Sequence, residues 1–204
     1  MIGILDYRIC NVGSVKRMFE RVGAAAEIFR DSHEIEMARG LILPGVGHFD
    51  HGMAGLARYF DLELIRECVV ERGVPILGIC LGMQLLCNSS EEGTTPGLGL
   101  VDASVRRFVA SDTRLKLPHM GWNSVTTARP NHLLPPIDKA QRFYFVHSYY
   151  VQPHREDIVT GTTDYGSRFC SSFEQGTIFG VQFHPEKSHR FGLDLFARFA
   201  QVVA

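Results

Sequence analysis

The sequence predicts an α/β fold: an open, mostly parallel sheet flanked by helices, with antiparallel strands added to it. Three observations support this fold class. Short apolar runs alternate with helix-like stretches through the first half of the chain, as in parallel sheets. The second half holds a succession of strand-like runs, several of them joined by tight turns, which favours antiparallel pairing. An amphipathic stretch closes the chain as a helix.

The first half of the chain is expected to alternate between strands and helices. Strands are expected at 2–5, 26–29, 41–43 and 74–77, and helices at 15–22, 62–71 and 81–87. Asp6 ends the first strand, and Gly23 closes the first helix because glycine readily adopts the conformation that ends helices. Pro44 and Gly45 stop the third strand, since proline cannot donate to a sheet ladder. The fourth strand leads directly towards the third helix.

The second half is expected to add antiparallel strands. These strands are expected at 104–109, 122–127, 142–151, 158–163, 169–174 and 177–182. The tight turn Glu174-Gln175-Gly176 joins the last two of them. A final helix is expected at 188–203, with Phe191, Leu195, Phe196, Phe199 and Val202 near one face. Because no repeat or linker interrupts the chain, we expect a single domain over 1–204.

Composition narrows the class of protein. The 204 residues are 45% hydrophobic and 21% charged, which suits one compact domain with a sizeable core. The formal net charge of −1 gives no reason to expect nucleic-acid or membrane binding. No apolar run approaches the roughly 20 residues of a membrane span, and the N-terminus becomes charged too early for a signal peptide. We therefore expect a cytoplasmic protein.

Cysteine usage fits the same compartment. The chain has five cysteines, an odd number, and no Cys-x-x-Cys pair, which argues against a disulfide framework or a zinc knuckle. Cys68, Cys87 and Cys170 are expected to be small buried apolar residues. His48, Asp50 and His51 form a local cluster of metal-ligand types, but no other ligand pattern lies near them. We expect neither a metal nor a cofactor.

The run 75–86 carries the most informative motif. Cys80 follows a short apolar strand and is flanked by Gly78 and Gly82 at i−2 and i+2. This is the nucleophile-elbow pattern, with sulfur in place of a serine hydroxyl. A strand that turns sharply into a helix crowds its own backbone, so side chains at the flanking positions would clash. The turn also places the sulfur at a helix N-terminus, which favours the thiolate.

A cysteine nucleophile needs a base, and the best candidate is His184. A strand is expected to run out at this residue, because Pro185 cannot continue a sheet ladder. Glu186 lies two residues further on, on the same side of an extended segment. It can accept a hydrogen bond from the far imidazole nitrogen and so fix the tautomer. Cys80, His184 and Glu186 are therefore expected to form a catalytic triad.

Acyl chemistry also needs hydrogen-bond donors for an oxyanion. Gly45, Val46 and Gly47 directly follow the third strand, and their glycines allow backbone amides to approach a substrate closely. The segment is too short for a phosphate-binding loop and lacks the Lys-Ser/Thr pair. The amide of Leu81, directly after the nucleophile, is the natural second donor.

The elbow 78–84 and the His184–Glu186 pair together resemble the class I glutamine amidotransferases. Finer motifs resemble one branch, the glutaminase subunits of imidazole glycerol phosphate synthases. These are Pro-Gly-Val-Gly at 44–47, Pro-His-Met-Gly-Trp-Asn at 118–123, Phe-Tyr-Phe-Val-His-Ser-Tyr at 143–149 and His-Pro-Glu-Lys-Ser at 184–188. The resemblance covers essentially the whole chain.

The resemblance implies hydrolysis of glutamine to glutamate. Cys80 would attack the side-chain amide, and His184 would move the protons. Gln84 and Glu92 match positions that hold the glutamine substrate. The loop that packs against the amino-acid end of glutamine corresponds to His147, Ser148 and Tyr149.

The resemblance also implies a protein partner. The ammonia would pass into a cyclase subunit with a (β/α)8 barrel, which makes imidazole glycerol phosphate and an aminoimidazole carboxamide ribotide in histidine biosynthesis. The chain itself has no recognisable phosphate-binding loop for that acceptor. The residues expected to face the partner are Asn11, His119, Trp122, Asn123 and Lys187. Such subunits show little glutaminase activity until the partner is loaded.

One segment departs from the family pattern. The family usually has glycine at the positions that here hold Arg8 and Cys10, whereas Asn11 and Ser14 keep their places. We expect the loop to move or to become bulkier. This departure leaves a paralogue as an alternative, one that feeds ammonia to an enzyme building an amidine on an amino sugar for surface polysaccharide. A non-catalytic redox sensor of the same fold is a further alternative, but it would not need the His184–Glu186 pair.

Overall fold

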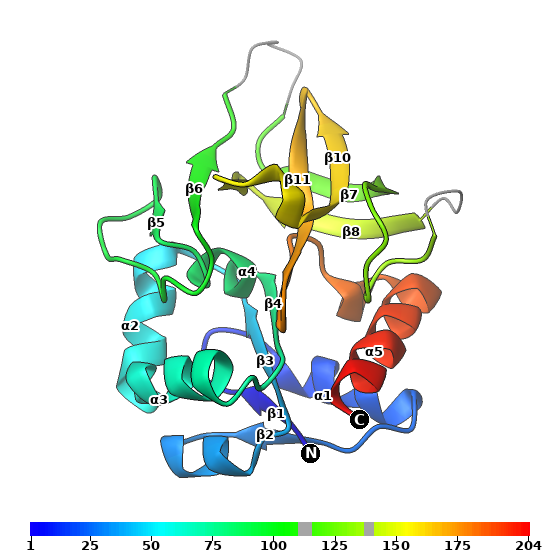
Figure 1. Cartoon of the computed structure of the whole chain (residues 1–204). Coiled ribbons are helices and arrows are strands. Elements are labelled where there is room, and N and C mark those ends of the chain that lie inside the picture. The colour runs from blue at the N-terminus through cyan, green and yellow to red at the C-terminus, as the bar shows by residue number, and fades with distance from the viewer. Residues whose placement is uncertain (110–115, 137–140) are drawn as a thin grey trace.

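The computed structural model describes residues 1–109, 116–136 and 141–204. Within these residues a mixed sheet of 12 strands forms the centre of the molecule (Figure 1). Its main strand order is β2-β1-β3-β4-β12-β11-β10-β7-β8, and β5, β6 and β9 pair beside this path.

The strands are β1 (Ile2–Leu5), β2 (Ala26–Phe29), β3 (Gly40–Gly45), β4 (Ile76–Cys80), β5 (Ser89–Ser90), β6 (Ala103–Arg107), β7 (His119–Thr127), β8 (Gln141–His147), β9 (Tyr149–Pro153), β10 (Val159–Tyr165), β11 (Ser167–Gln175) and β12 (Ile178–Val181). The helices are α1 (Val12–Arg21), α2 (Phe49–Tyr59), α3 (Leu62–Arg66), α4 (Leu81–Leu85) and α5 (His189–Val203), and a π-helical turn, Glu67–Glu71, continues α3. Short 3-10 turns lie at Ser32–Met37, Glu156–Ile158 and Pro185–Lys187.

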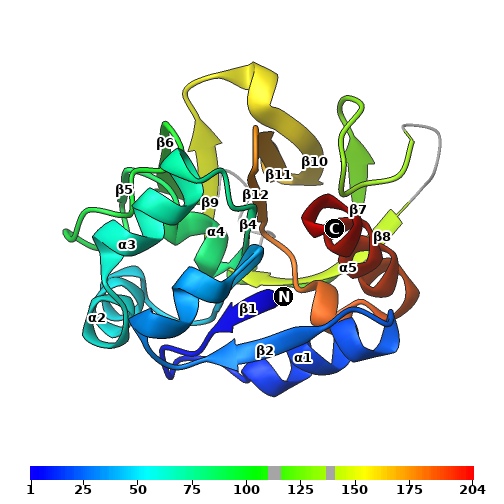
Figure 2. The same ribbon diagram turned by 60° about the horizontal axis from the view of Figure 1, so that its bottom comes forward.

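Strands β2, β1, β3, β4 and β12 pair in parallel. All residues of β1, β3, β4 and β12 are buried, as expected when helices cover both faces of a parallel sheet. Helices α1 and α5 lie on one face (Figure 2). Between them Phe19 packs edge-on against Phe196 at 4.8 Å between ring centroids. Helices α2, α3 and α4 lie on the other face (Figure 2). These layers confirm the predicted core of the fold.

Antiparallel strands extend this core. Strand β11 pairs with β12 and β10, and β7 pairs with β10 and β8. The turn between β11 and β12 contains Gly176, whose φ of 59° lies in the left-handed region that favours glycine. The antiparallel additions to the sheet are therefore confirmed as well.

The third strand continues through Pro44 to Gly45, beyond its expected end at 43. Pro44 pairs in register with Ile79 of β4, whereas β1 pairs with β3 only as far as Ile42. The carbonyl oxygen of Pro44 accepts a hydrogen bond of 2.7 Å from the Tyr7 hydroxyl. Because the nitrogen and the carbonyl group of one strand residue point to the same side, the Pro44 nitrogen also lies on the side where β1 has ended. The absence of an N–H group on Pro44 therefore costs the sheet no hydrogen bond.

The expected strand 142–151 is two strands, β8 and β9, separated by Ser148. Strand β8 pairs with β7, whereas β9 pairs with β6 and β11. The chain thus changes neighbours at Ser148. The sequence also gave no expectation of helix α2 or of the two-residue strand β5.

Cys80 lies on a strained turn between β4 and α4. Its φ of 54° and ψ of −108° are unusual for a residue with a side chain. A Cβ atom on Gly82 would lie 1.7 Å from the carbonyl oxygen of Leu43, and one on Gly78 would lie 2.7 Å from that of Gly82. The glycines are therefore required by close backbone approach, as the elbow pattern predicted.

Arg8 also adopts a left-handed conformation, with a φ of 68°. Its amide donates to Asp6 Oδ1 at 3.2 Å, and its guanidinium lies 3.4 Å from the same carboxylate and 5.9 Å from the Tyr59 ring. The arginine thus holds a backbone geometry that glycine adopts more easily.

Among the described residues, no helix combines the length and apolar character needed to span a membrane.

Candidate active site

The carboxyl ends of three neighbouring strands form the candidate site. Gly45 at the end of β3 is in register with Cys80 at the end of β4. On the other side of β4, Val181 at the end of β12 is in register with Ile79. His184 follows β12 by three residues. Parallel pairing therefore brings the elbow, the glycine turn and the candidate base to one edge of the sheet.

The candidate base is held rigidly. His184 Nδ1 lies 2.7 Å from Glu186 Oε1, and the His184 side chain is buried while that of Glu186 is partly buried. The backbone amide of His184 donates to the carbonyl oxygen of Tyr144 at 2.8 Å, and the Ser188 hydroxyl donates to the carbonyl oxygen of His184 at 2.6 Å. The Nε2 atom is buried and has no hydrogen-bond partner in the described chain. The expected orientation by Glu186 is thus present in the geometry.

Burial acts to lower the pKa of His184, but the nearby charges of Cys80 and Glu186 outweigh it and raise this pKa to about 10. A proton on the His184 imidazole is therefore favoured in the folded protein. The imidazolium can act as a proton donor beside the Cys80 sulfur. All five cysteines lie within the described ranges and are free thiols.

A cavity of about 160 Å³ gathers most of the expected substrate residues. Its lining consists of Val46, Gly47, Cys80, Leu81, Gln84, Glu92, Val146, His147, Ser148 and Tyr149. The glycine turn, the amide that follows the nucleophile and the expected substrate loop therefore share one small space. Gly47 has a φ of 106°, a conformation that a side chain would strain.

A second cavity of about 250 Å³ reaches the base from another side. Asn11, His184, Glu186 and Lys187 contribute to its lining, and so does Cys10. Burial and the negative charges of Glu186, Asp6 and Cys80 raise the pKa of Cys10 to about 12. Its thiol is therefore neutral at physiological pH, which fits a space-filling role.

Gln84 is buried and both of its amide hydrogens are used inside the protein. Its Nε2 donates to the carbonyl oxygen of Tyr149 at 3.1 Å and to Gln182 Oε1 at 3.1 Å. Its carbonyl oxygen is therefore the group left to contact a ligand. Gln182 also donates from Nε2 to Cys80 Sγ at 3.7 Å. Gln182 was not among the residues expected from the sequence, and only its position two residues before His184 pointed to it.

Glu92 links the cavity to helix α2. Its Oε2 accepts a hydrogen bond of 2.9 Å from the amide of Phe49, the first residue of that helix. Asp50 accepts the amides of Thr94 and Thr95 at 3.1 and 3.0 Å, and these bonds lower its pKa. Within the His48-Phe-Asp50-His51 cluster, Asp50 thus anchors the loop after Glu92. Within the described ranges, no group of three or more potential ligands gathers around a metal position.

The residues expected to face a partner differ in their exposure to solvent. Trp122 is 39% exposed and stacks on His189 at 5.5 Å, and Lys187 lies 5.8 Å above the Tyr144 ring. His119, in contrast, is only 3% exposed and stacks on Tyr165 at 3.9 Å. The side chain of His119 therefore does not reach the surface, which corrects the expectation that it faces a partner. Asn11 is exposed, and Asn123 is partly buried.

Asn123 and His119 begin a buried hydrogen-bond network. Asn123 Nδ2 lies 3.2 Å from His119 Nε2, and His119 Nδ1 lies 2.9 Å from His147 Nε2. His147 Nδ1 then lies 2.7 Å from the carbonyl oxygen of Tyr149. Burial lowers the pKa of His119 to about 4 and the pKa of His147 to about 3. Both imidazoles are therefore neutral in the folded protein.

This neutrality predicts that acid destabilises the fold. Between pH 6.5 and about 4 the unfolded chain binds protons at His119 and His147 that the folded chain excludes. The free energy of unfolding should therefore fall as the pH drops through this window, by up to about 1.4 kcal/mol per pH unit for each histidine. His184 has the opposite effect on the free energy of unfolding, at higher pH. The stability that its raised pKa contributes is lost as the pH rises from 6.5 to about 10.

Urea unfolding at pH 7, 6 and 5 measures this effect. In His119→Gln the slope between pH 7 and 5 should be smaller than in the unmodified chain. An unfolding free energy that stays constant over this range would contradict the assignment of neutral, buried imidazoles.

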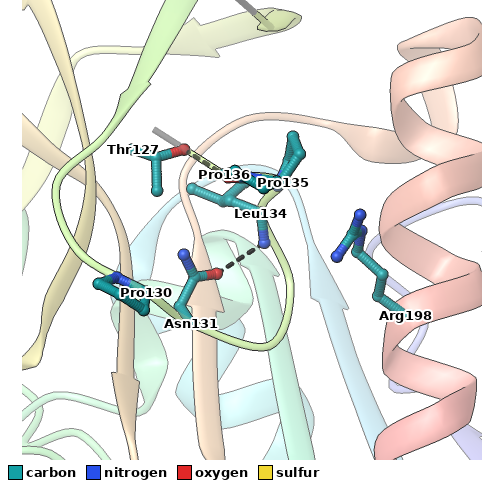
Figure 3. A pocket seen from close by; sticks show the side chains of 7 residues that line it. All are labelled: Thr127, Pro130, Asn131, Leu134, Pro135, Pro136 and Arg198. Atoms are coloured by element: carbon teal, nitrogen blue, oxygen red, sulfur yellow. Dashed lines mark hydrogen bonds between the residues drawn. The ribbon is translucent and has the colours of Figure 1, made fainter. Parts of the chain in front are cut away.

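A larger cavity, of about 570 Å³, lies apart from the triad, between the 127–136 segment and α5 (Figure 3). Its polar groups already have partners. Asn131 Oδ1 accepts the amide of Leu134 at 2.6 Å, and Thr127 Oγ1 donates to the carbonyl oxygen of Pro135 at 3.0 Å. Arg198 reaches towards it from α5 and pairs with Asp194 at 2.9 Å. None of the residues expected for catalysis lines this cavity.

Comparison with known proteins identifies the family. The model of the family "Glutamine amidotransferase class-I" matches residues 4–201. The "Imidazole glycerol phosphate synthase subunit HisH" of Moorella thermoacetica is 49% identical over 99% of this chain and 95% of its own length. The "Imidazole glycerol phosphate synthase subunit HisH 2" of Pseudomonas aeruginosa is 44% identical, and the alignment covers 100% of both chains.

Solved structures share the fold at lower sequence identity. "PurLQS from Thermotoga maritima" aligns with a TM-score of 0.74 and 19% identity, over 100% of this chain and 98% of that one. A "putative gmp synthase subunit a protein" from Thermoplasma acidophilum aligns with a TM-score of 0.73 and 20% identity, over 99% of this chain and 92% of that one. The family match and the full-length relatives agree with the elbow and the His184–Glu186 pair. This chain belongs to the class I glutamine amidotransferase family.

Proposed function

We propose that this chain is the glutaminase subunit of an imidazole glycerol phosphate synthase. It hydrolyses glutamine to glutamate and supplies the ammonia to a cyclase subunit in histidine biosynthesis. One observation carries the chemical part of this proposal. The strained elbow of Cys80 lies between the Gly45–Gly47 turn and the His184–Glu186 pair, at one sheet edge that borders a small cavity. The relatives named above support the pathway.

The reaction begins with attack of the Cys80 thiolate on the side-chain amide carbon of glutamine. The proton on His184 passes to the leaving nitrogen, which departs as ammonia and leaves a glutamyl thioester. Neutral His184 then takes a proton from water, which attacks the thioester. Glutamate leaves, the thiolate forms again, and the proton remains on His184. The raised pKa of His184 supports this cycle because it keeps the proton on the imidazole beside a thiolate.

Backbone amides stabilise the oxyanion in both steps. Val46 and Gly47 approach from the end of β3, and Leu81 is the first residue of α4. Such donors are worth roughly 10²–10³-fold in rate when they are correctly placed. The Tyr7 hydroxyl fixes the carbonyl of Pro44 at 2.7 Å, which holds the start of this turn.

Gln84, Glu92 and the loop of His147, Ser148 and Tyr149 bind the substrate. Gln84 contributes its remaining carbonyl oxygen, and Glu92 contributes a carboxylate for the amino group of glutamine. The cavity of about 160 Å³ that these residues line favours a single small amino-acid substrate over a protein chain.

The cyclase partner is a (β/α)8 barrel that binds near Asn11, Trp122, Asn123 and Lys187. Trp122 offers a large exposed aromatic surface and Lys187 a positive charge beside the second cavity. A partner placed here faces the cavity that reaches His184 and can receive ammonia without its release to solvent. The chain acts as a single domain in the cytoplasm, and the partner holds the phosphate-bearing acceptor.

Rescue of a histidine auxotroph that lacks its glutaminase subunit tests this function. The chain is expressed together with the cyclase from its own genome, so that a mismatch with the host cyclase cannot hide activity. We expect growth without histidine and no growth when Cys80 is replaced by alanine. Failure of the unmodified pair to restore growth would contradict the histidine pathway.

A second candidate remains the feeding of ammonia to an enzyme that builds an amidine on an amino sugar. The observation that favours keeping it is the departure from the family pattern at Arg8 and Cys10, where the family usually has glycine. Glutaminase activity without rescue of the auxotroph would favour this candidate.

A further inference from the structure

The side chain of Gln182 joins the nucleophile to the expected substrate-binding residue. It is fully buried directly after β12, donates from Nε2 to Cys80 Sγ at 3.7 Å and accepts at Oε1 from Gln84 Nε2 at 3.1 Å. We propose that Gln182 is a positioning residue that holds Cys80 and Gln84 in register and stabilises the thiolate. The reaction it serves is the proposed one.

The orientation of this amide is determined by its neighbours. The carbonyl oxygen of Tyr149 can only accept, so the Gln84 amide nitrogen must face it. The second hydrogen of the same nitrogen then requires an acceptor, and Gln182 Oε1 is that acceptor. Gln182 must therefore present its N–H group to the sulfur. If the Gln182 amide were flipped, its NH2 group would face the NH2 group of Gln84. Its carbonyl oxygen would then face the Cys80 thiolate.

The backbone supports this placement. The amide of Gln182 donates to the carbonyl oxygen of Ser171 at 2.9 Å, which extends the pairing of β12 with β11 by one residue. Val181 and Ile79 are in register, so Gln182 lies beside Cys80. His184 comes two residues later on the same segment. One strand end thus delivers both the base and the thiolate donor.

Only glutamine satisfies both neighbours at this position. Glutamate has the same shape but would direct a carboxylate at the sulfur. Methionine also fills a similar volume but would leave a buried Gln84 hydrogen unpaired, which carries a desolvation penalty. The two replacements therefore separate the two contacts. Gln182→Glu removes the donor to sulfur and keeps an acceptor for Gln84, whereas Gln182→Met removes both.

Alkylation of Cys80 tests the donor directly. The rate of iodoacetamide labelling of the Cys80 peptide is measured by mass spectrometry between pH 5 and 10 on the full-length chain. In both variants the rate–pH profile should move to higher pH, and labelling at pH 7 should slow by about tenfold, as expected for loss of a hydrogen bond to a charged group. This readout does not require glutamine to be the substrate, so it stands if the proposed function fails.

Steady-state kinetics of the chain in complex with its partner test whether Gln182 holds Cys80 and Gln84 in position. Gln182→Glu should lower kcat with little change in KM, whereas Gln182→Met should also raise KM because Gln84 loses its partner. The matched control is Gln141→Met, which replaces another buried glutamine, one that donates to Thr127 at 3.5 Å outside the site. It should leave the alkylation profile and both kinetic constants unchanged.

Thermal unfolding separates positioning from simple structural support. If the Gln182 variants fold and their alkylation profiles match that of the unmodified chain, the proposal is wrong. If neither variant folds while Gln141→Met does, Gln182 is a structural residue and the proposal is equally wrong.

Discussion

Cys80→Ala should abolish glutamine-dependent synthesis by the complex, with a loss on the order of 10⁴-fold or more. Alanine has no sulfur to form the thioester, whereas the partner does not depend on this residue for its own chemistry. Synthesis from added ammonium salts should therefore continue at the unmodified rate. Product formation with glutamine and with ammonium, measured on the same preparation, checks both halves of this expectation.

The matched control for this variant is Cys87→Ala. Cys87 is fully buried two residues after α4, and its sulfur donates to the carbonyl oxygen of Met83 at 3.6 Å. Its replacement should lower stability slightly through a small cavity and leave glutamine-dependent turnover intact. Glutamine-supported turnover by Cys80→Ala would show that the nucleophile is a different residue.

Glu186→Gln should lower kcat by about 10²–10⁴-fold while the protein stays folded. The carboxylate of Glu186 lies 2.7 Å from His184 Nδ1, and in the proposed mechanism it fixes the tautomer and stabilises the imidazolium. An amide of the same shape removes the charge, so the pKa of His184 should fall. The pH profile of kcat should therefore lose activity at its alkaline side earlier than in the unmodified enzyme.

Glu174→Gln is the control for this second variant. Glu174 lies 2.8 Å from His132 Nδ1, but that histidine is exposed, and neither residue lines the two cavities beside the triad. Its replacement should leave kcat and the pH profile unchanged. Equal losses in the two variants would indicate general destabilisation rather than a role of Glu186 in the triad.

Local signals predicted the elbow well. Gly78 and Gly82 were selected from spacing alone. In the structure a Cβ on Gly82 would collide with the carbonyl oxygen of Leu43, and one on Gly78 would collide with the backbone of Gly82 and Met83. The pairing of Cys80 with His184 could not be read from spacing, because 104 positions separate them in the sequence. It was inferred from the chemistry of the run 184–186, where a histidine at a strand end stands two residues before a carboxylate. In the structure it follows from the parallel pairing of β4 and β12.

An error in the predicted start of β7 limited the prediction of which residues are exposed. The strand with Trp122 was expected to start at 122, whereas β7 starts at His119. Once the strand is extended, alternation places His119 on the buried side, opposite Met120 and Trp122, which are 61% and 39% exposed. Met120 therefore lies on the same exposed face of β7 as Trp122.

Helix α2 was missed because its composition argues against a helix. Gly52 and Gly55 both weaken helical propensity. The structure explains both residues through packing, since a Cβ on Gly52 would lie 3.0 Å from Leu81 and one on Gly55 would lie 3.1 Å from the carbonyl oxygen of Tyr7. Tertiary contacts with the elbow and the first loop thus override local preference. Gln182 was missed for a related reason, since its role depends on neighbours distant in sequence.

Glutamate release tests the central claim most directly. The purified chain is assayed alone, with its cyclase partner, and with the partner loaded with its nucleotide ligand. We predict little glutamate from the chain alone and a large increase in the loaded complex, with the ammonia recovered in the cyclase product. Full activity of the chain alone would contradict gating by the partner, and no glutamate from the loaded complex would contradict the assignment of Cys80, His184 and Glu186 to glutamine hydrolysis.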